Sequence, residues 1–420
     1  MQSTEQTEMT KSAMIAVVGA GTMGSSIVVA LLAAGYSVLL KETDQAFLDK
    51  GMANIDRLLS GRVKKGLAPE EAQLQRSRID CVLDFERFAE VDFVIEAAPE
   101  NIEIKKSIFE QLDQWCNVDA ILATNTSSLS ITQIANFARR ADKVVGLHFF
   151  NPAHVMKLVE VIPGLETSHD TVARALELAQ SMGKLAIRVE ECASFLVNRL
   201  LGRYMNESLF ALESGVAGVE EIDKAVCDYV MPIGPLALRD MNGADIGLAV
   251  ASFNYQEYGE RFAVPSLLGR MVEANMLGQK TMAGFYSYDK ETRKRSGVNP
   301  DLLKLLSAPK AKAKGKSKPM SNLMPTTVFT AEALFLPMIN EAFLAMQERI
   351  CQPEDLDAAL MAGLGMRRGP LTLASEIGLK DCLSLLEAAF RADSAGRLQE
   401  RFRPAPLLKR FVWAGRSSVL

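Results

Sequence analysis

Residues 14–35 form a continuous pattern, MIAVVGAGTMGSSIVVALLAAG, that restricts the fold more than any other stretch of the sequence. Five apolar residues precede three glycines, Gly19, Gly21 and Gly24, and a helix-forming segment follows. No charged residue occurs between residues 13 and 40, a length that could span a bilayer. Because the glycines interrupt it after five apolar residues, the pattern predicts a buried strand, a tight turn and a helix, and no membrane span.

The spacing of these glycines is typical of a loop that binds a dinucleotide. The first glycine permits the tight turn, the second lets the backbone approach a pyrophosphate, and the third lets the helix pack against the strand. The loop backbone at Ala20, Thr22 and Met23 and the free N–H groups of the helix would then face the phosphates. A glycine turn without a ligand is the alternative.

The second predicted strand indicates which dinucleotide this would be. Glu42, which lies 18 residues after Gly24, ends that strand and could accept hydrogen bonds from both ribose hydroxyls. A carboxylate there would repel a 2′-phosphate, so NAD is favoured over NADP. The positive charge of the neighbouring Lys41 would instead favour NADP.

Strand and helix patterns alternate along the first half of the chain. Besides the first strand, strands are predicted at residues 37–41, 92–98, 120–124, 143–149, 156–162 and 185–189, with a long helix over 46–66. Such alternation is typical of a parallel α/β sheet. We therefore predict an α/β Rossmann-type NAD-binding domain at residues 13–190, after a flexible tail at residues 1–12.

The second half is helical and repeats itself. The segment MNESLFALESGVAGVEEIDKAV, from Met205, matches INEAFLAMQERICQPEDLDAAL, from Ile339, and each copy leads to a Gly-Pro pair. This match favours duplication over a chance pattern of helix formers. We predict two tandem all-α domains, residues 191–306 and 323–420, joined by a lysine-rich linker at residues 307–322. Phosphate binding is a second interpretation of that linker.

Composition limits the class of protein. With 48% hydrophobic and 23% charged residues the chain should fold, and a net charge of −4 gives no attraction to nucleic acid or anionic membranes. The six cysteines are scattered, so neither a disulfide framework nor a metal site is expected. The first twelve residues contain no arginine and do not resemble a leader sequence, so the cytoplasm is the predicted location.

A second group of polar residues suggests the chemistry beside a nicotinamide. Oxidation of a secondary alcohol needs a base for the hydroxyl proton, a carboxylate that orients the base, and donors that hold the substrate oxygen. Ser127 and His148 each follow an apolar run, so both are expected at carboxyl ends of strands, where ligands bind open α/β sheets. Asn125, Asn151 and Glu160 complete the group. A core histidine satisfied by backbone groups is the alternative for His148.

Six stretches of the sequence resemble the 3-hydroxyacyl-CoA dehydrogenase family, NAD-dependent enzymes of fatty-acid β-oxidation. They are GAGTMG (19–24), EAAPENIEIKK (96–106), ATNTSSLSI (123–131), GLHFFNPAHVMKLVEVI (146–162), FLVNRLL (195–201) and GQKTMAGFYSY (278–288). The resemblance covers residues 13–290 and, through the repeat, 323–420, as in members with two tandem C-terminal domains. It implies reversible oxidation of (S)-3-hydroxyacyl-CoA to 3-ketoacyl-CoA, with NAD as cofactor and an acyl-CoA thioester as substrate.

The resemblance also implies roles for single residues. His148 would be the general base and Glu160 its orienting carboxylate, while Ser127 and Asn198 would hydrogen-bond the substrate oxygen. Contacts to NAD would come from the glycine loop and from Glu42, Ala97, Glu100, Lys105, Asn125, Ser127, Asn151 and Lys280. Lys65 is a candidate for binding the CoA phosphates, with a basic solvated helix face as the alternative.

Two departures from the family pattern bear on substrate fit rather than on hydride chemistry. Ala193-Ser194 replaces the usual Pro-Gly, and Met282 and Ala283 replace Gly-x in K-T-G-x-G-F-Y.

In members with one helical domain that domain forms the dimer interface, and an internal duplicate could replace the partner subunit, so a monomer or a homodimer is expected. A dehydrogenase of non-thioester β-hydroxy acids and a non-catalytic dinucleotide-binding protein are the alternative functions.

Overall fold

The computed structural model describes residues 14–307, 329–392 and 397–419. The predicted tail at residues 1–12 and nearly all of the predicted linker at residues 307–322 lie outside these ranges. The chain divides into two compact units, residues 1–195 and residues 196–420.

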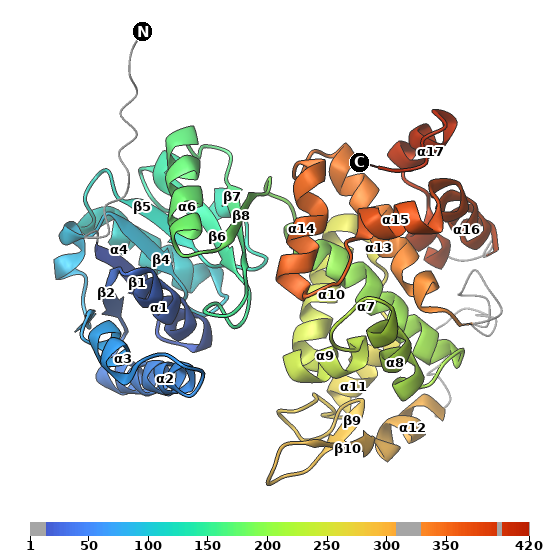
Figure 1. Ribbon diagram of the computed structural model, residues 1–420, viewed down its shortest axis with the longest axis horizontal. Helices are drawn as coiled ribbons and strands as arrows, with labels where there is room; N and C mark the ends of the chain where they lie inside the picture. The colour runs from blue at the N-terminus through green and yellow to red at the C-terminus, as the bar shows by residue number, and fades with distance from the viewer. Residues whose placement is uncertain (1–13, 308–328, 393–396, 420) are drawn as a thin grey trace. The chain divides into compact units, whose positions relative to one another are not determined.

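The first unit contains an eight-stranded sheet with the order β3-β2-β1-β4-β5-β6-β7-β8 (Figure 1). Neighbouring strands are parallel except for β6 and β7. The strands are β1 Met14–Val18, β2 Ser37–Lys41, β3 Ile79–Val82, β4 Phe93–Glu96, β5 Ile121–Thr124, β6 Val144–Phe149, β7 Leu158–Pro163 and β8 Leu185–Arg188. Every predicted strand is present, and β3 is an additional one.

Helices cover both faces of this sheet, which is why its strands are apolar on both sides. In β1, Ile15 and Val17 pack with one set of buried side chains, and Ala16 and Val18 pack with another. The first set includes residues of α1 (Thr22–Ala34), α2 (Gln45–Val63) and α6 (His169–Ser181), and the second includes residues of α4 (Ile102–Trp115) and α5 (Ile131–Ala135). The remaining helices of the unit are η1 Glu86–Glu90, η2 Ala141–Lys143 and α3 Pro69–Arg76. The result is the three-layer Rossmann-like arrangement that the sequence predicted.

The sheet is parallel, as predicted, except where β7 pairs with β6. Only residues 150–157 connect β6 to β7, whereas a parallel crossover needs about a dozen residues or more. β7 therefore returns antiparallel beside β6, and β8 pairs parallel to β7. This register places His148 directly opposite Glu160.

The second unit is helical apart from one small hairpin, β9 Tyr286–Tyr288 with β10 Arg295–Val298. Its first series of helices is α7 Val197–Ser214, α8 Val219–Tyr229, α9 Pro235–Asn242, α10 Ala244–Tyr258, η3 Gly259–Phe262, α11 Ser266–Glu273 and α12 Pro300–Ser307. The second series is α13 Ala331–Gln347, α14 Pro353–Leu364, α15 Pro370–Ile377, α16 Leu379–Ala392, η4 Arg397–Phe402 and α17 Pro406–Trp413. The helices α7 to α11 of the first series follow one another along the chain in the same order as the helices α13 to α17 of the second (Figure 1).

A matching contact accounts for the Gly-Pro pair in each series. The carboxylate of Asp223 accepts hydrogen bonds from the backbone N–H groups of Leu236 and Ala237, at the start of α9. In the second series Asp357 accepts the equivalent bonds at the start of α15. A Cβ atom on Gly234 or on Gly369 would overlap the carboxyl group concerned, so only glycine fits at either position.

Buried ion pairs join the two helical series. Glu207 of α7 lies 2.9 Å from Arg401 of η4, and Glu341 of α13 lies 2.7 Å from Arg199 of α7. All four side chains are at most 1% exposed. Since Glu207 and Glu341 occupy equivalent positions in the repeat, each series supplies a carboxylate to an arginine of the other.

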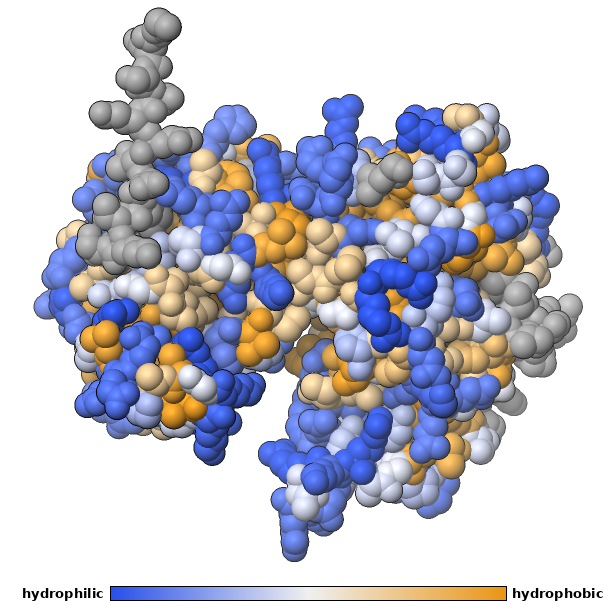
Figure 2. Space-filling view, viewed as in Figure 1, coloured by the Kyte–Doolittle hydropathy of each residue, from blue (hydrophilic) through white to orange (hydrophobic). Residues whose placement is uncertain are grey.

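Polar and charged side chains cover much of the face shown in Figure 2, with apolar side chains interspersed among them. Some large apolar side chains, including Leu165 and Trp413, are mostly exposed. Among the described residues, no helix has both the length and the apolar character needed to cross a membrane.

Candidate active site

The glycine loop between β1 and α1 has the shape that a dinucleotide requires. Gly19 has a φ of +100°, and a Cβ atom there would lie 2.9 Å from the carbonyl oxygen of Ala97. A Cβ atom on Gly24 would overlap the carbonyl oxygen of Gly19, whereas one on Gly21 would meet no protein atom within 4 Å. Packing therefore requires the first and third glycines, while the second faces open space into which a pyrophosphate fits.

The start of α1 leaves donors for that pyrophosphate. Gly21 is the N-cap residue and supplies no side-chain hydrogen bond to the first turn, which begins at Thr22 and continues through Met23. The N–H groups of that turn and the positive end of the helix dipole are thus available to an anion. These residues fit an NAD pyrophosphate.

Glu42 lies beside this loop. Its carboxylate accepts hydrogen bonds from the backbone N–H groups of Ala20 and Thr43, which fixes it at the end of β2. The ammonium group of Lys41 lies over the ring of Phe85, 4.5 Å from its centroid, and burial lowers the pKa of Lys41 against the opposing effect of nearby carboxylates. The lysine charge is thus held against an aromatic ring, which leaves Glu42 as the group at the predicted ribose position.

The structure brings His148 and Glu160 into direct contact. Nδ1 of His148 lies 2.6 Å from Oε2 of Glu160, and the two side chains are almost completely buried. The rings of Phe150 and Phe195 pack against the imidazole, with centroids 4.6 and 5.7 Å away. Because a carboxylate can only accept, the proton of a neutral imidazole lies on Nδ1, which leaves the lone pair of Nε2 for a substrate proton.

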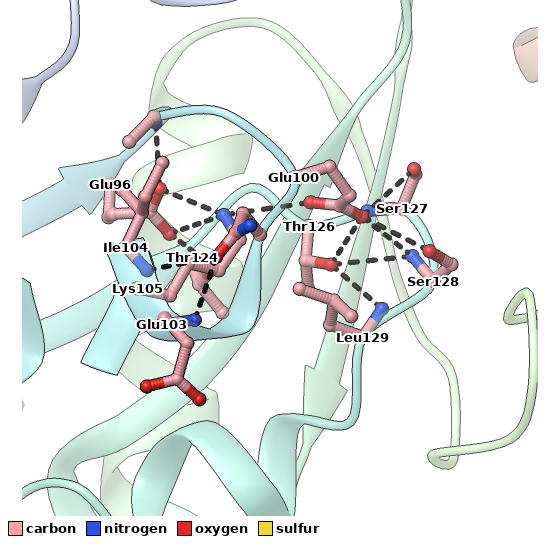
Figure 3. A network of polar contacts seen from close by, with 12 residues as sticks. Glu96, Glu100, Glu103, Ile104, Lys105, Thr124, Thr126, Ser127, Ser128 and Leu129 are labelled. Atoms are coloured by element: carbon pink, nitrogen blue, oxygen red, sulfur yellow. Dashed lines mark hydrogen bonds and ion pairs between the residues drawn. The ribbon is translucent and has the colours of Figure 1, made fainter. Parts of the chain in front are cut away.

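A buried ion pair lies where β4 meets its following loop (Figure 3). Glu96 is completely buried and accepts hydrogen bonds from Nζ of Lys105, at 2.8 Å to each oxygen, and from Oγ1 of Thr124 at 2.6 Å. Lys105 is also completely buried, and its Nζ lies 3.6 Å from Glu100. The predicted contact of Lys105 with NAD remains a prediction, and its ammonium group is already bound by two carboxylates.

Glu100 connects this ion pair to the loop after β5 (Figure 3). Its Oε1 accepts hydrogen bonds from the hydroxyl of Thr126, from the backbone and hydroxyl of Ser127, and from the backbone and hydroxyl of Ser128. Burial opposes ionisation, but Lys105 and these donors hold the pKa of Glu100 below its usual value. The Ser127 hydroxyl donates to Glu100 at 3.2 Å, so it must turn before it can donate to a substrate oxygen.

The other predicted residues of the first unit lie around these groups. Oδ1 of Asn125 accepts the backbone N–H of Phe149 at 2.9 Å, which ties the end of β5 to β6 beside His148. Asn151 is exposed and lies two residues beyond the end of β6, and the Ala97 carbonyl approaches Gly19. The first unit thus holds most of the predicted cofactor contacts at the carboxyl ends of its strands.

Two predicted site residues belong to the helical unit. Asn198 lies in the first turn of α7, and Nζ of Lys280 lies 2.5 Å from Asp245. Their contacts with substrate and NAD remain predictions.

Lys65 lies in the turn that follows α2, close to other cations that sequence reasoning missed. Burial and the charges of Arg62, Lys184 and Lys65 lower the pKa of His154, whose Nδ1 lies 2.8 Å from Oγ of Ser26. Arg62 lies three residues before Lys65, a spacing that could have indicated a shared helix face. Lys184 is remote in sequence, and no local pattern indicates it.

Other features of the described residues do not add to this site. A cavity of about 380 Å³ in the helical unit is lined by residues of α8 and the β9–β10 hairpin and by none of the predicted site residues. Within the described ranges, no group of three or more His, Cys, Asp and Glu side chains is placed to hold a metal ion.

Comparison with known protein families covers both units. The family model described as 3-hydroxyacyl-CoA dehydrogenase, NAD binding domain, matches residues 14–192. The model described as 3-hydroxyacyl-CoA dehydrogenase, C-terminal domain, matches residues 195–288 and 329–419.

Individual relatives agree with these matches. A 3-hydroxybutyryl-CoA dehydrogenase of Clostridioides difficile is 44% identical over 66% of this chain and 99% of its own length. A 3-hydroxyadipyl-CoA dehydrogenase of Escherichia coli is 32% identical over 94% of this chain and 96% of its own length. The chain spans about half the length of the multifunctional β-oxidation proteins that it matches.

A solved structure matches nearly the whole fold. The crystal structure of a 3-hydroxybutyryl-CoA dehydrogenase from Escherichia coli K12 superposes with a TM-score of 0.82 and 30% identity, covering 96% of this chain and 98% of that one. The predicted family and its cofactor, NAD, are thereby confirmed. The chain belongs to the 3-hydroxyacyl-CoA dehydrogenase family.

Proposed function

We propose that this chain catalyses the reversible NAD-dependent oxidation of (S)-3-hydroxyacyl-CoA thioesters to 3-ketoacyl-CoA thioesters. The observation that carries the proposal is the 2.6 Å contact between His148 and the buried Glu160, at the end of a sheet whose glycine loop fits NAD. The named acyl-CoA substrates of the relatives support a thioester. The stereochemistry follows from the family resemblance alone.

His148 acts as the base in this proposal. Nε2 removes the proton of the C3 hydroxyl, and Glu160 stabilises the imidazolium that forms because its carboxylate accepts the proton on Nδ1. NAD, when bound, supplies the hydride acceptor. In the reverse direction the imidazolium returns the proton to the 3-keto oxygen.

The substrate oxygen and the CoA group need further contacts. Ser127 holds the oxygen at C3, and Glu100 fixes the loop that carries Ser127. Asn198 is carried over from the family resemblance as a further substrate contact. Lys65, together with Arg62 and Lys184, attracts the CoA phosphates in this proposal, since the charges of all three act on His154, whose pKa burial and these cations lower.

The direct test is consumption of NADH by the purified chain with acetoacetyl-CoA, followed by absorbance, with acetoacetate as the control substrate. Turnover of the thioester and little turnover of the free acid is the expected result. Turnover of the free acid alone would indicate a dehydrogenase of non-thioester β-hydroxy acids. Binding of NADH without turnover of either would indicate a non-catalytic dinucleotide-binding protein.

The proposal includes the setting in which the enzyme works. All six cysteines are free thiols, which suits the reducing cytoplasm. The reciprocal ion pairs between the helical series support a monomer, because the duplicate fills the place of a partner subunit. Light scattering after size exclusion distinguishes this monomer from a homodimer.

A further inference from the structure

Arg239 of α9 is a buried cation without a counterion. Its side chain is 9% exposed, and no hydrogen bond or ion pair links it to another side chain of the described residues. The Nε atom is fully buried and has no partner. Burial lowers the pKa of Arg239 to about 10, so the guanidinium is still charged at neutral pH. A buried charge normally has a partner, and here the described protein supplies none.

Tyr204 of α7 is a second unsatisfied donor near this guanidinium. Its ring is completely buried and stacks on Phe335, with centroids 4.8 Å apart, and its hydroxyl has no hydrogen-bond partner. Burial and the charges of Asp223 and Cys227 raise the pKa of Tyr204, while the charge of Arg239 opposes that shift. The Tyr204 hydroxyl and the Arg239 Nε–H are thus two buried donors that no acceptor of the described residues satisfies.

Gly247 of α10 makes room for the guanidinium. A Cβ atom on Gly247 would overlap Nη1 of Arg239 and would lie 2.7 Å from its Cδ and Cζ atoms. Any other residue at position 247 would therefore displace the arginine side chain.

The second helical series shows that the fold does not need these groups. The repeat aligns Tyr204 with Met338, Arg239 with Ala374 and Gly247 with Cys382. Met338, Ala374 and Cys382 are completely buried, and the Cys382 thiol fills the space beside Ala374, with Sγ 3.8 Å from the Ala374 carbonyl oxygen. The second series packs this position with apolar atoms, whereas the first places a guanidinium and a phenol there.

We propose that the first helical series contains a carboxylate-binding site between α7, α9 and α10. Arg239 is its ionic partner and Tyr204 its second donor. The class is a carboxylate rather than a phosphate, because a single guanidinium balances one negative charge and its planar fork matches a carboxylate. Two sources can supply this group: a free small carboxylate, or the terminal carboxylate of an acyl-CoA substrate, and only the second rests on the proposed function.

Thermal unfolding of the full chain tests the free-ligand source, with adipate as probe and the neutral adipamide as its control. Adipate is expected to raise the Tm saturably, and adipamide is not. The matched variant carries Tyr204→Met, Arg239→Ala and Gly247→Cys, which give these three positions the residues of the second series. It removes a buried unpaired charge and restores apolar packing, so it should fold and should lose the response to adipate.

A kinetic comparison tests the substrate source, using 3-hydroxyacyl-CoA thioesters of equal length with and without a terminal carboxylate. If the acyl chain supplies the carboxylate, the ratio of the two kcat/KM values favours the carboxylate in the parent and falls at least tenfold in Arg239→Ala/Gly247→Cys. Turnover of the plain thioester reports separately on the proposed function. The site does not exist if adipate leaves the parent Tm unchanged and the parent shows no preference for the terminal carboxylate, whatever the variants do.

Discussion

Both units of this protein bury ion pairs, but the pairs continue into different surroundings. In the first unit Lys105 and Glu96 are at most 1% exposed, and their network passes through Glu100 to the partly exposed hydroxyl of Ser127. In the helical unit the equally buried pair of Arg401 and Glu207 joins one helical series to the other. The first network thus reaches a hydroxyl group that a substrate can contact, whereas both members of the second pair are buried between helices.

The difference shows that burial and pairing do not by themselves identify a functional charge. A buried ion pair contributes little net stability, yet removal of one member is costly because the other is left unpaired. The two networks differ in whether their last member is exposed to a substrate or buried. Substitutions in each unit should therefore affect different measurements.

The largest expected effect is on turnover, from His148→Gln. Loss of the base should lower kcat by roughly 10²–10⁴ without unfolding the sheet. Steady-state kinetics with acetoacetyl-CoA and NADH measures this, and Glu160→Gln should show a loss in the same direction. Parental turnover in purified His148→Gln would remove His148 from the mechanism.

In the helical unit, Glu207→Gln should lower the free energy of unfolding by about 3–5 kcal/mol, because Arg401 stays buried without its carboxylate. Urea unfolding measures the loss, while kcat of the folded fraction should stay at the parental value. Replacing both partners, by Glu207→Met with Arg401→Met, should restore most of the stability. An equal loss in the double variant would mean that the pair itself stabilises the unit.

Glu96→Gln should lower both the free energy of unfolding and the catalytic efficiency, whereas Glu207→Gln should lower only the first. Lys105 then keeps only Glu100, 3.6 Å away, as a counterion, which destabilises the unit and disturbs the support of the loop that carries Ser127. We therefore expect kcat/KM of the folded enzyme to fall about 10- to 100-fold. Kinetics at a temperature where the variant is folded measures this effect. If kcat/KM were unchanged there, the two buried networks would be functionally alike and the comparison would fail.

The smallest expected effect concerns a backbone position. Met282 has a φ of +59° at a place where the family pattern has glycine. A side chain there costs about 1–2 kcal/mol, partly offset by the greater entropy of glycine in the unfolded chain, so Met282→Gly should raise the free energy of unfolding by about 0.5–1 kcal/mol. Ala283→Gly is the matched control and should lower it, since Ala283 lacks a positive φ.

Much of the first unit could be predicted from sequence because its strands are buried on both faces. β3 was missed because Asp80 and Cys81 are exposed, so this edge strand lacks an apolar run. The direction of β7 was missed because strand patterns do not encode direction, although the short connection before it does exclude a parallel crossover.

The candidate site was predicted less completely. The contact between His148 and Glu160 was expected from the required chemistry and from the family resemblance, but its cause, the register of β6 and β7, was not. The burial of Lys105 between Glu96 and Glu100 depends on how α4 packs against β4, which spacing in sequence does not reveal. Arg239 carried no signal at all, because a lone arginine in a helix normally reaches solvent.

The antiparallel return of β7 has a consequence for how such an enzyme can change. Ladder hydrogen bonds, and not the connecting loop, hold His148 opposite Glu160, and a slip of one residue would send one of the two side chains to the other face. The strand register, and not the length of residues 150–157, therefore sets the spacing of the proton-transfer pair, although Phe150 in that connection packs against the imidazole. Evolution can therefore change the residues of this loop that bind ligands while the geometry of the pair that transfers the proton is kept.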